Sequence, residues 1–262
     1  MTTHTIDEAT VRQLALTLDA ALLARREIEP LTKTHGPLSL EDAYAVQHAG
    51  VALRLLRGEK IVGYKMGLTS RAKREQMNLG QPIYGALTDG MRVLDAGDIS
   101  IATGIHPKAE PEVAFVTARE LRGSISREQA LAACGGVAAA IEILDSRFVG
   151  FKYFSLPDVV ADLCSSWRFV LGKLHAPCEV GELKMSFFID GKLKHEASSS
   201  AISGHPLESL VQLVAMLDAH GQSLPAGSIV LAGAATAAEA LQPGMSVELQ
   251  IEGLGKASLT AS

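Results

Sequence analysis

The sequence is poor in cysteine, with only Cys134, Cys164 and Cys178 among its 262 residues. Their number is odd, they lie far apart in the chain, and no two of them form a CxxC pair. This usage argues against both a disulfide framework and a zinc site built from thiolates. It fits a reducing compartment best, so we expect a cytoplasmic protein.

Long apolar runs and basic clusters are also missing. No uninterrupted apolar segment approaches the roughly 18 residues of a membrane-spanning helix, and the first residues, MTTHTIDEATVRQ, carry acidic side chains instead of an export signal. The net charge is −5, and lysine and arginine gather only in short pieces such as residues 71–74. We therefore expect no membrane insertion, no export and no nucleic-acid binding, and the partners should be small molecules or other protein chains.

The residues that are present are those of an ordinary globular protein. Hydrophobic residues make up 47% of the chain and charged residues 20%, which argues against disorder. The length suits one large domain, or one domain with a small appendage, and either buries a sizeable core.

Periodicity separates a helical beginning from a mostly β remainder. Apolar residues recur at helical spacing over residues 7–26, and a capping box of Ser39 and Asp42 begins a second helix that Gly58 ends. The later predicted elements are helices over residues 70–77 and 206–221, strands over residues 61–67, 137–144, 182–191, 227–233 and 245–253, and a hairpin turn at Asp190-Gly191. We predict an α+β fold with a small helical N-terminal part, residues 1–60, and a larger, mostly β domain, residues 61–262.

Three carboxylates occupy unusual positions in the predicted strands. In HPKAEPEVAF, residues 106–115, alternation places Lys108, Glu110 and Glu112 on one face of a strand. Glu142 stands between isoleucines in a run that is too apolar for a surface strand, and a lone buried glutamate is costly. A solvated strand face and structural salt bridges remain possible explanations. The alternative is a set of hard oxygen ligands for Mg²⁺ or Mn²⁺.

One lysine and two serines are further candidates. Lys65 lies in GYKMGLTS between Gly63 and Gly67, which would let a ligand approach the backbone. Such a lysine either extends along apolar surface to water or is held in a site to bind or transfer charge. Ser165 and Ser166 precede an apolar strand in SSWRFVLG, where they either cap a turn or bind a carboxylate.

Four stretches carry a resemblance when they are taken together and in order: GYKMGLTS, EPEVAF, AIEILDSR and SSWRFVLG. They resemble the family of 2-oxopent-4-enoate hydratases and 4-oxalocrotonate decarboxylases of the catechol meta-cleavage pathway, which are relatives of fumarylacetoacetase. The likeness covers nearly the whole chain, including GHPLESLVQL and LAGAATAAEALQPG. It implies a fumarylacetoacetase-like fold with a mixed β-roll or barrel. It also implies a divalent metal, Mg²⁺ or Mn²⁺, held by Glu110, Glu112 and Glu142, with Lys65 beside it.

One position favours the decarboxylase branch of this family. Its hydratases carry an aspartate in a Pro-Asp-Phe-Gly stretch, whereas QPIYG of this chain has Ile83 there. Adding water needs a group that orients and deprotonates it, whereas loss of CO₂ is helped by keeping water away. We therefore expect conversion of 2-oxo-3-hexenedioate to 2-hydroxypenta-2,4-dienoate and CO₂, without an organic cofactor. The alternatives are the hydratase activity and a non-catalytic subunit that channels an intermediate.

The resemblance also suggests roles for individual residues. Lys65 would hold the metal-proximal carboxylate or protonate the enolate, and Ser165 would donate a hydrogen bond to the substrate. Lys108 would orient the far carboxylate, or would instead form a salt bridge to Glu110 or Asp145. The further expected substrate contacts are Leu68 and Ile83. The expected partners are a small dicarboxylate substrate, further copies of the chain in a homo-oligomer, and the hydratase of the same pathway.

Overall fold

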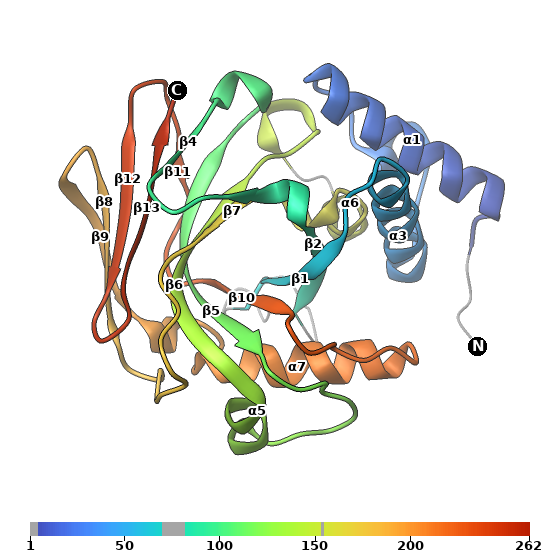
Figure 1. The fold of residues 1–262 in the computed structure, drawn as a ribbon. Helices are drawn as coiled ribbons and strands as arrows, with labels where there is room; N and C mark the ends of the chain where they lie inside the picture. The colour runs from blue at the N-terminus through green and yellow to red at the C-terminus, as the bar shows by residue number, and fades with distance from the viewer. Residues whose placement is uncertain (1–4, 70–81, 153–154) are drawn as a thin grey trace.

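The computed structural model of this chain describes residues 5–69, 82–152 and 155–262 (Figure 1). Helices α1, α3 and α6 gather beside a curled sheet, and α5 and α7 lie below it in the view of Figure 1. The helices are α1 (Glu8–Ala24), α2 (Leu31–Thr34), α3 (Leu40–Leu56), α5 (Arg127–Ala133), α6 (Leu156–Ala161) and α7 (Pro206–Ala219). The strands are β1 (Ile61–Gly67), β2 (Ile83–Thr88), β3 (Arg92–Val93), β4 (Gly97–Ile99), β5 (Lys108–Thr117), β6 (Cys134–Leu144), β7 (Ser166–Leu171), β8 (Lys184–Ile189), β9 (Lys192–Ser198), β10 (Ile229–Ala234), β11 (Glu239–Ala240), β12 (Ser246–Ile251) and β13 (Gly255–Ala261).

The strands form two sheets. The larger, curled sheet has the order β2-β1-β10-β5-β6-β7-β3, with β11 paired to β5. The smaller sheet has the order β4-β13-β12-β8-β9 and lies against the outer face of the larger one (Figure 1). The core includes Val113, Phe115 and Ile141 of the larger sheet and Phe187 and Leu249 of the smaller sheet. Val113 and Phe115, which alternate with the glutamates along β5, therefore lie in the core.

The opposite face of the larger sheet carries small side chains. Ala114 and Ala138 are paired across β5 and β6, and both are fully buried, as is Ala140. Paired residues of an antiparallel ladder point to the same side, so these alanines share one face inside the curl. Short side chains there leave space for the carboxylates of Glu112 and Glu142, which lie two residues from Ala114 and Ala140 on the same strands.

The N-terminal helices join this core through an apolar stripe. Leu14 and Leu18 of α1 and Val46 of α3 are buried in the same cluster as the strand residues. Full burial of such a side chain contributes roughly 1.5–3 kcal/mol. The predicted capping box of Ser39 and Asp42 is present at the start of α3. The capping residues therefore set where α3 begins, and its apolar residues set the face that packs against the core.

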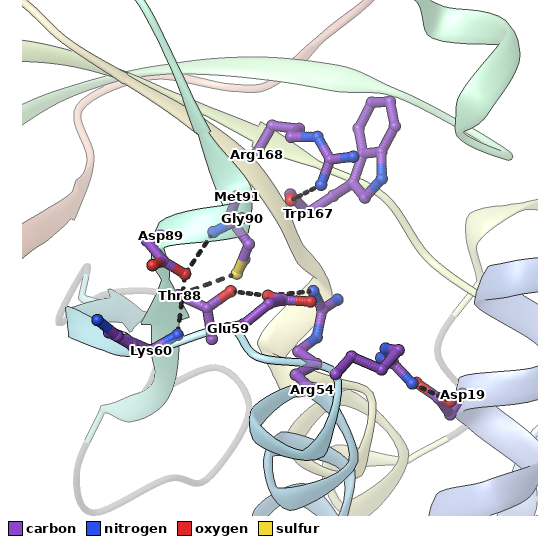
Figure 2. Close-up of polar contacts among 11 residues, drawn as sticks. Asp19, Arg54, Glu59, Lys60, Thr88, Asp89, Gly90, Met91, Trp167 and Arg168 are labelled. Atoms are coloured by element: carbon purple, nitrogen blue, oxygen red, sulfur yellow. Dashed lines mark hydrogen bonds and ion pairs between the residues drawn. The ribbon is translucent and has the colours of Figure 1, made fainter.

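A network of polar contacts joins the end of α3 to the first two strands (Figure 2). Arg54 Nη1 lies 3.4 Å from Glu59 Oε2, and Thr88 Oγ1 donates a hydrogen bond to the same carboxylate oxygen. Lys60 N donates to Asp89 Oδ1 over 2.9 Å, and Asp89 N donates to Lys60 O over 2.9 Å. These contacts fix the point at which β1 begins, and therefore where its later residues lie.

The predicted α+β architecture is confirmed. The helices expected over residues 7–26 and 206–221 and the five expected strands are present, with ends that differ by a few residues. Asp190 and Gly191 form the hairpin turn with φ of 51° and 70°, the left-handed values that a tight two-residue turn requires. The helix expected over residues 70–77 lies outside the described residues. Within the described ranges, no helix combines the length and the apolar character needed to span a bilayer.

Candidate functional site

Strand register brings the three candidate carboxylates together. Glu110 of β5 is directly opposite Glu142 of β6, and Glu112 follows two positions later on the same face. Lys65 of β1 is paired with Leu231 of β10, which is paired in turn with β5 two residues beyond Glu112. Because paired residues point to the same side, all four charged side chains share the concave face of the larger sheet.

The carboxylates are close enough to share one cation. One oxygen from each of Glu110, Glu112 and Glu142 lies within 4.8 Å of the others. Glu112 and Glu142 are fully buried, and Glu110 is half-buried. Gly233 N donates a hydrogen bond to Glu112 Oε2 over 2.7 Å. Among the described residues, the other oxygen of Glu112 and Glu142 Oε1 have no hydrogen-bond partner, and Glu142 Oε2 has only the ion pair with Lys65. This all-oxygen donor set fits a hard divalent cation such as Mg²⁺.

The electrostatics of the cluster show the need for such a cation. Burial raises the pKa of Glu112 well above its ordinary value, and the negative charges of Glu142 and Glu110 raise it further. Lys65 opposes this effect in part. Burial works against the Lys65 ammonium, but the neighbouring carboxylates, Glu142 foremost, outweigh it and raise the pKa of Lys65. Lys65 is therefore held as an ammonium among the carboxylates.

Lys65 is fixed from two sides. Its Nζ lies 3.0 Å from Glu142 Oε2 and donates a hydrogen bond to the Cys164 carbonyl oxygen over 3.0 Å. The residue is 3% exposed, so the ammonium does not extend to water along the surface. An ammonium has three N–H donors. Among the described residues its contacts are this carbonyl and the Glu142 carboxylate, which leave one donor for a ligand.

The residues around Lys65 include two of the expected substrate contacts. Ile83 of β2 is buried and paired with Gly67, and a Cβ on Gly67 would lie 3.0 Å from Ile83 Cγ1 and 3.9 Å from Lys65 Nζ. Ile83 is thus close to the ammonium. Leu68 follows β1 in a left-handed conformation, with φ of 53°, and is half-buried.

Gly63 has a different use from the expected one. A Cβ at this position would lie 1.8 Å from the carbonyl oxygen of Ile229 on β10. The glycine therefore lets a neighbouring strand approach, and the expectation that it opens the backbone to a ligand is wrong. Close packing of β1 against β10 is what the position provides.

The two serines lie beside the Cys164 carbonyl. Ser165 is 1% exposed with φ of 61°, and Ser166 is fully buried as the first residue of β7. Neither hydroxyl has a hydrogen-bond partner among the described residues. They do not cap a turn, so that alternative is wrong. A buried hydroxyl without a partner is costly, and a polar ligand would satisfy it.

Lys108 is the candidate whose contacts differ most from expectation. Its ammonium lies 3.9 Å from the centre of the Phe151 ring, a cation–π contact, rather than in an ion pair with another described residue. Asp145 instead accepts hydrogen bonds from the backbone N–H groups of Ile105 and His106, over 3.0 and 2.6 Å. Lys108, His106 and Phe151 border an open cavity of about 630 Å³.

Two contributors to the site are backbone groups. The Cys164 carbonyl accepts from Lys65, and the Gly233 N–H donates to Glu112. Side-chain chemistry cannot reveal either of them. For the Gly233 N–H, the signal in the sequence is the glycine itself, because a glycine inside a strand often marks a close approach of another group to the backbone.

Comparisons with known proteins agree with this geometry. The family model for the C-terminal part of fumarylacetoacetate (FAA) hydrolase matches residues 66–260. The 4-oxalocrotonate decarboxylase of a Pseudomonas species is 41% identical over 253 residues, which cover 96% of this chain and 98% of that protein. The 2-hydroxyhexa-2,4-dienoate hydratase of Comamonas testosteroni is 36% identical over 245 residues, covering 91% of this chain and 92% of that protein.

A solved structure matches over almost the full length. It is that of 4-oxalocrotonate decarboxylase from Pseudomonas putida G7, complexed with magnesium and adipate. The TM-score is 0.95 at 34% sequence identity, and the match covers 99% of this chain and 100% of that chain. The predicted fumarylacetoacetase-like α+β fold class is therefore confirmed.

Proposed function

The chain belongs to the fumarylacetoacetate hydrolase family, and from this premise we propose that it is a metal-dependent carboxy-lyase that converts 2-oxo-3-hexenedioate to 2-hydroxypenta-2,4-dienoate and CO₂. The observation that carries the proposal is the cluster of three carboxylates with Lys65 against one of them. The identity to a decarboxylase, 41%, exceeds the 36% identity to a hydratase. The isoleucine beside Lys65 supports the same choice.

The metal in this proposal is Mg²⁺ or Mn²⁺, with Glu110, Glu112 and Glu142 as its ligands. The unsatisfied buried oxygens of Glu112 and Glu142 support it, since a cation would remove the cost of burying them. A bound divalent ion would act as a Lewis acid on the 2-oxo acid end of the substrate, an effect worth several kcal/mol.

The substrate has its own electron sink. Breaking the C5–C6 bond releases CO₂, and the electron pair forms C4=C5 while the C3=C4 pair moves to C2=C3 and the carbonyl pair to the 2-oxo oxygen. Lys65 then hydrogen-bonds that oxygen through its remaining N–H and delivers the proton that makes it a hydroxyl. Ser165 donates a hydrogen bond to the substrate. The two orphaned serine hydroxyls support this role.

The apolar residues keep water from the reacting end. Ile83 and Leu68 contact the substrate and provide no group that could activate a water molecule. Lys108 orients the far carboxylate, and its position two residues before Glu110 on β5 supports this assignment. A tight ion pair would hold back the departing carboxylate, so contact with the Phe151 ring suits a weaker, orienting role.

The wider setting is also part of the proposal. We infer a cytoplasmic enzyme of catechol meta-cleavage that forms a homo-oligomer and associates with the pathway hydratase. The three free cysteines support a reducing compartment. We further propose residues 1–60 as the N-terminal helical part and residues 61–262 as the catalytic domain, supported by a family match that begins at residue 66.

The test uses metal-stripped protein and freshly generated 2-oxo-3-hexenedioate. CO₂ release and dienoate absorbance are followed with and without Mg²⁺, and 2-hydroxypenta-2,4-dienoate is then offered alone. Metal-dependent CO₂ release without consumption of the dienoate supports the decarboxylase. Consumption of the dienoate without CO₂ would show a hydratase, and inactivity on both substrates would favour a non-catalytic subunit.

A further inference from the structure

A short left-handed turn lies next to Lys65. Leu163, Cys164 and Ser165 have φ values of 52°, 52° and 61°, and none of them is glycine. L-residues adopt this conformation at an energetic cost, so three in succession are rare and persist only where the surroundings impose them. The turn carries the Cys164 carbonyl that accepts from Lys65.

The backbone bonds of the turn hold both of its ends. Ser165 N donates to Asp162 O over 2.9 Å, and Asp145 N donates to Ser165 O over 2.8 Å. In the middle, the Cys164 thiol donates to Tyr84 O over 3.1 Å. Burial raises the pKa of Cys164 to about 12, so the sulfur keeps the proton that it donates.

A glycine on β2 makes room for the turn. Gly85 is directly opposite Lys65 in the ladder of β1 and β2. A Cβ at Gly85 would lie 2.9 Å from the Leu163 carbonyl oxygen and 3.7 Å from Cys164 Cβ. The turn therefore rests on bare strand backbone at the position that faces Lys65.

A buried glutamine of α3 connects the turn with its neighbours. Gln47 is 2% exposed, and its Nε2 lies 2.8 Å from Val160 O, 3.2 Å from Tyr84 O and 3.8 Å from Cys164 Sγ. One amide group thus contacts α6, β2 and the turn. No role in binding or chemistry follows from this position, because Gln47 contacts the rear of the turn.

We propose that Gln47 and Gly85 are positioning residues that act on Lys65 through the Cys164 carbonyl. They hold the left-handed turn where this carbonyl fixes the ammonium together with Glu142, each 3.0 Å from Nζ, and directs its third N–H toward the substrate. The N-terminal helix α3 thereby contributes to the reaction without touching the substrate. The inference rests on the proposed function, in which Lys65 meets the 2-oxo oxygen.

The first test variant is Gly85→Ala, which forces the turn off β2. We expect kcat for CO₂ release to fall on the order of tenfold to a hundredfold, while KM changes by less than about twofold because substrate contacts remain. The Mg²⁺ affinity, measured by titration calorimetry, should stay within about threefold, because all three carboxylates are retained. Gly97→Ala is the matched control, since Gly97 begins β4, outside the site, and its Cβ would lie 2.7 Å from the Leu94 carbonyl oxygen.

The second variant is Gln47→Met, which removes the amide at similar volume. Its matched control is Gln212→Met on α7, which makes the same chemical change away from the turn. We expect kcat to fall by about tenfold in the first and to remain unchanged in the second. Cys164→Ser should keep kcat within about threefold, because the hydroxyl still donates to Tyr84 O, whereas Cys164→Ala should not.

A readout that does not need activity is the acetylation rate of Lys65, measured by mass spectrometry. Release of the ammonium should raise this rate in Gly85→Ala and Gln47→Met but not in the two controls. An active wild type with variants that match their controls in kcat and acetylation would overturn the inference. A loss of kcat that follows the loss of Mg²⁺ affinity would overturn it too. A wild type that releases no CO₂ refutes the proposed function, and acetylation alone then decides whether the turn positions Lys65.

Discussion

Glu112→Gln should make the metal-free protein more stable while it removes metal binding. Glu112 is fully buried and within 4.8 Å of an oxygen of each of two other carboxylates. Two unit charges at that distance repel by about 3.5 kcal/mol at an effective dielectric constant of about 20. Lys65 offsets part of this repulsion, since its ammonium contacts Glu142. A glutamine also keeps the oxygen that accepts from Gly233 N.

The net gain should be about 1–3 kcal/mol in the free energy of unfolding without metal. For a chain of this size the melting temperature then rises by roughly 2–10 °C. With Mg²⁺ at about a hundred times its Kd, the wild type gains about 2.7 kcal/mol, whereas the variant, lacking one ligand, gains much less. The order of the two melting temperatures should therefore reverse between EDTA and Mg²⁺.

The pH dependence has a definite sign. The pKa of Glu112 is raised in the folded protein by burial and by Glu142, so the folded state binds more protons than the unfolded state. The stability of the metal-free wild type then falls as the pH rises above about 4.5, the ordinary value for glutamate. The advantage of Glu112→Gln should grow over the same interval.

Thermal unfolding in EDTA and in Mg²⁺ at several pH values measures all three effects, with the exposed Glu252→Gln as control. The reasoning fails if Glu112→Gln unfolds below the wild type in EDTA at neutral pH. It fails equally if Mg²⁺ raises both melting temperatures by the same amount.

Three further predictions concern other parts of the chain. Asp42→Asn should lower the free energy of unfolding by about 1 kcal/mol. Burial opposes the charge of Asp42, but hydrogen bonds from Thr5 and Ser39 outweigh it and lower the pKa of this carboxyl. Denaturation curves should therefore show that the contribution of Asp42 disappears as the pH falls below about 4. Ile83→Asp should reduce CO₂ release at least about tenfold, because a carboxylate beside Lys65 competes for the ammonium, and steady-state assays check this. Lys108→Met should raise KM for the dicarboxylate more than it lowers kcat, and an unchanged KM would exclude an orienting role.

The sequence reveals side-chain alternation but not strand pairing. Alternation placed Glu110 and Glu112 on one face of β5, and the structure agrees. That Glu142 lies directly opposite Glu110 depends on the register of β5 with β6, which no local pattern encodes. The resemblance to a known family supplied this grouping where the periodicity could not.

Weak patterns explain what was missed. In β13, GKASLTA, the buried positions include two alanines, Ala257 and Ala261, so the apolar alternation is faint and the strand was not predicted. Gly63 appeared to open the strand to a ligand, yet its neighbour is the backbone of β10. A glycine indicates close approach without telling which group approaches.

The choice between losing CO₂ and adding water depends on the side of Lys65 that faces β2. Gly67 has no side chain there, and a Cβ at this position would lie 3.0 Å from Ile83 Cγ1 and 3.9 Å from Lys65 Nζ. A carboxylate in that place would pair with Lys65 and orient a water molecule. An isoleucine does neither, and among the described residues the ammonium contacts Glu142 and the Cys164 carbonyl. In the proposed function, this apolar side chain therefore favours decarboxylation over hydration.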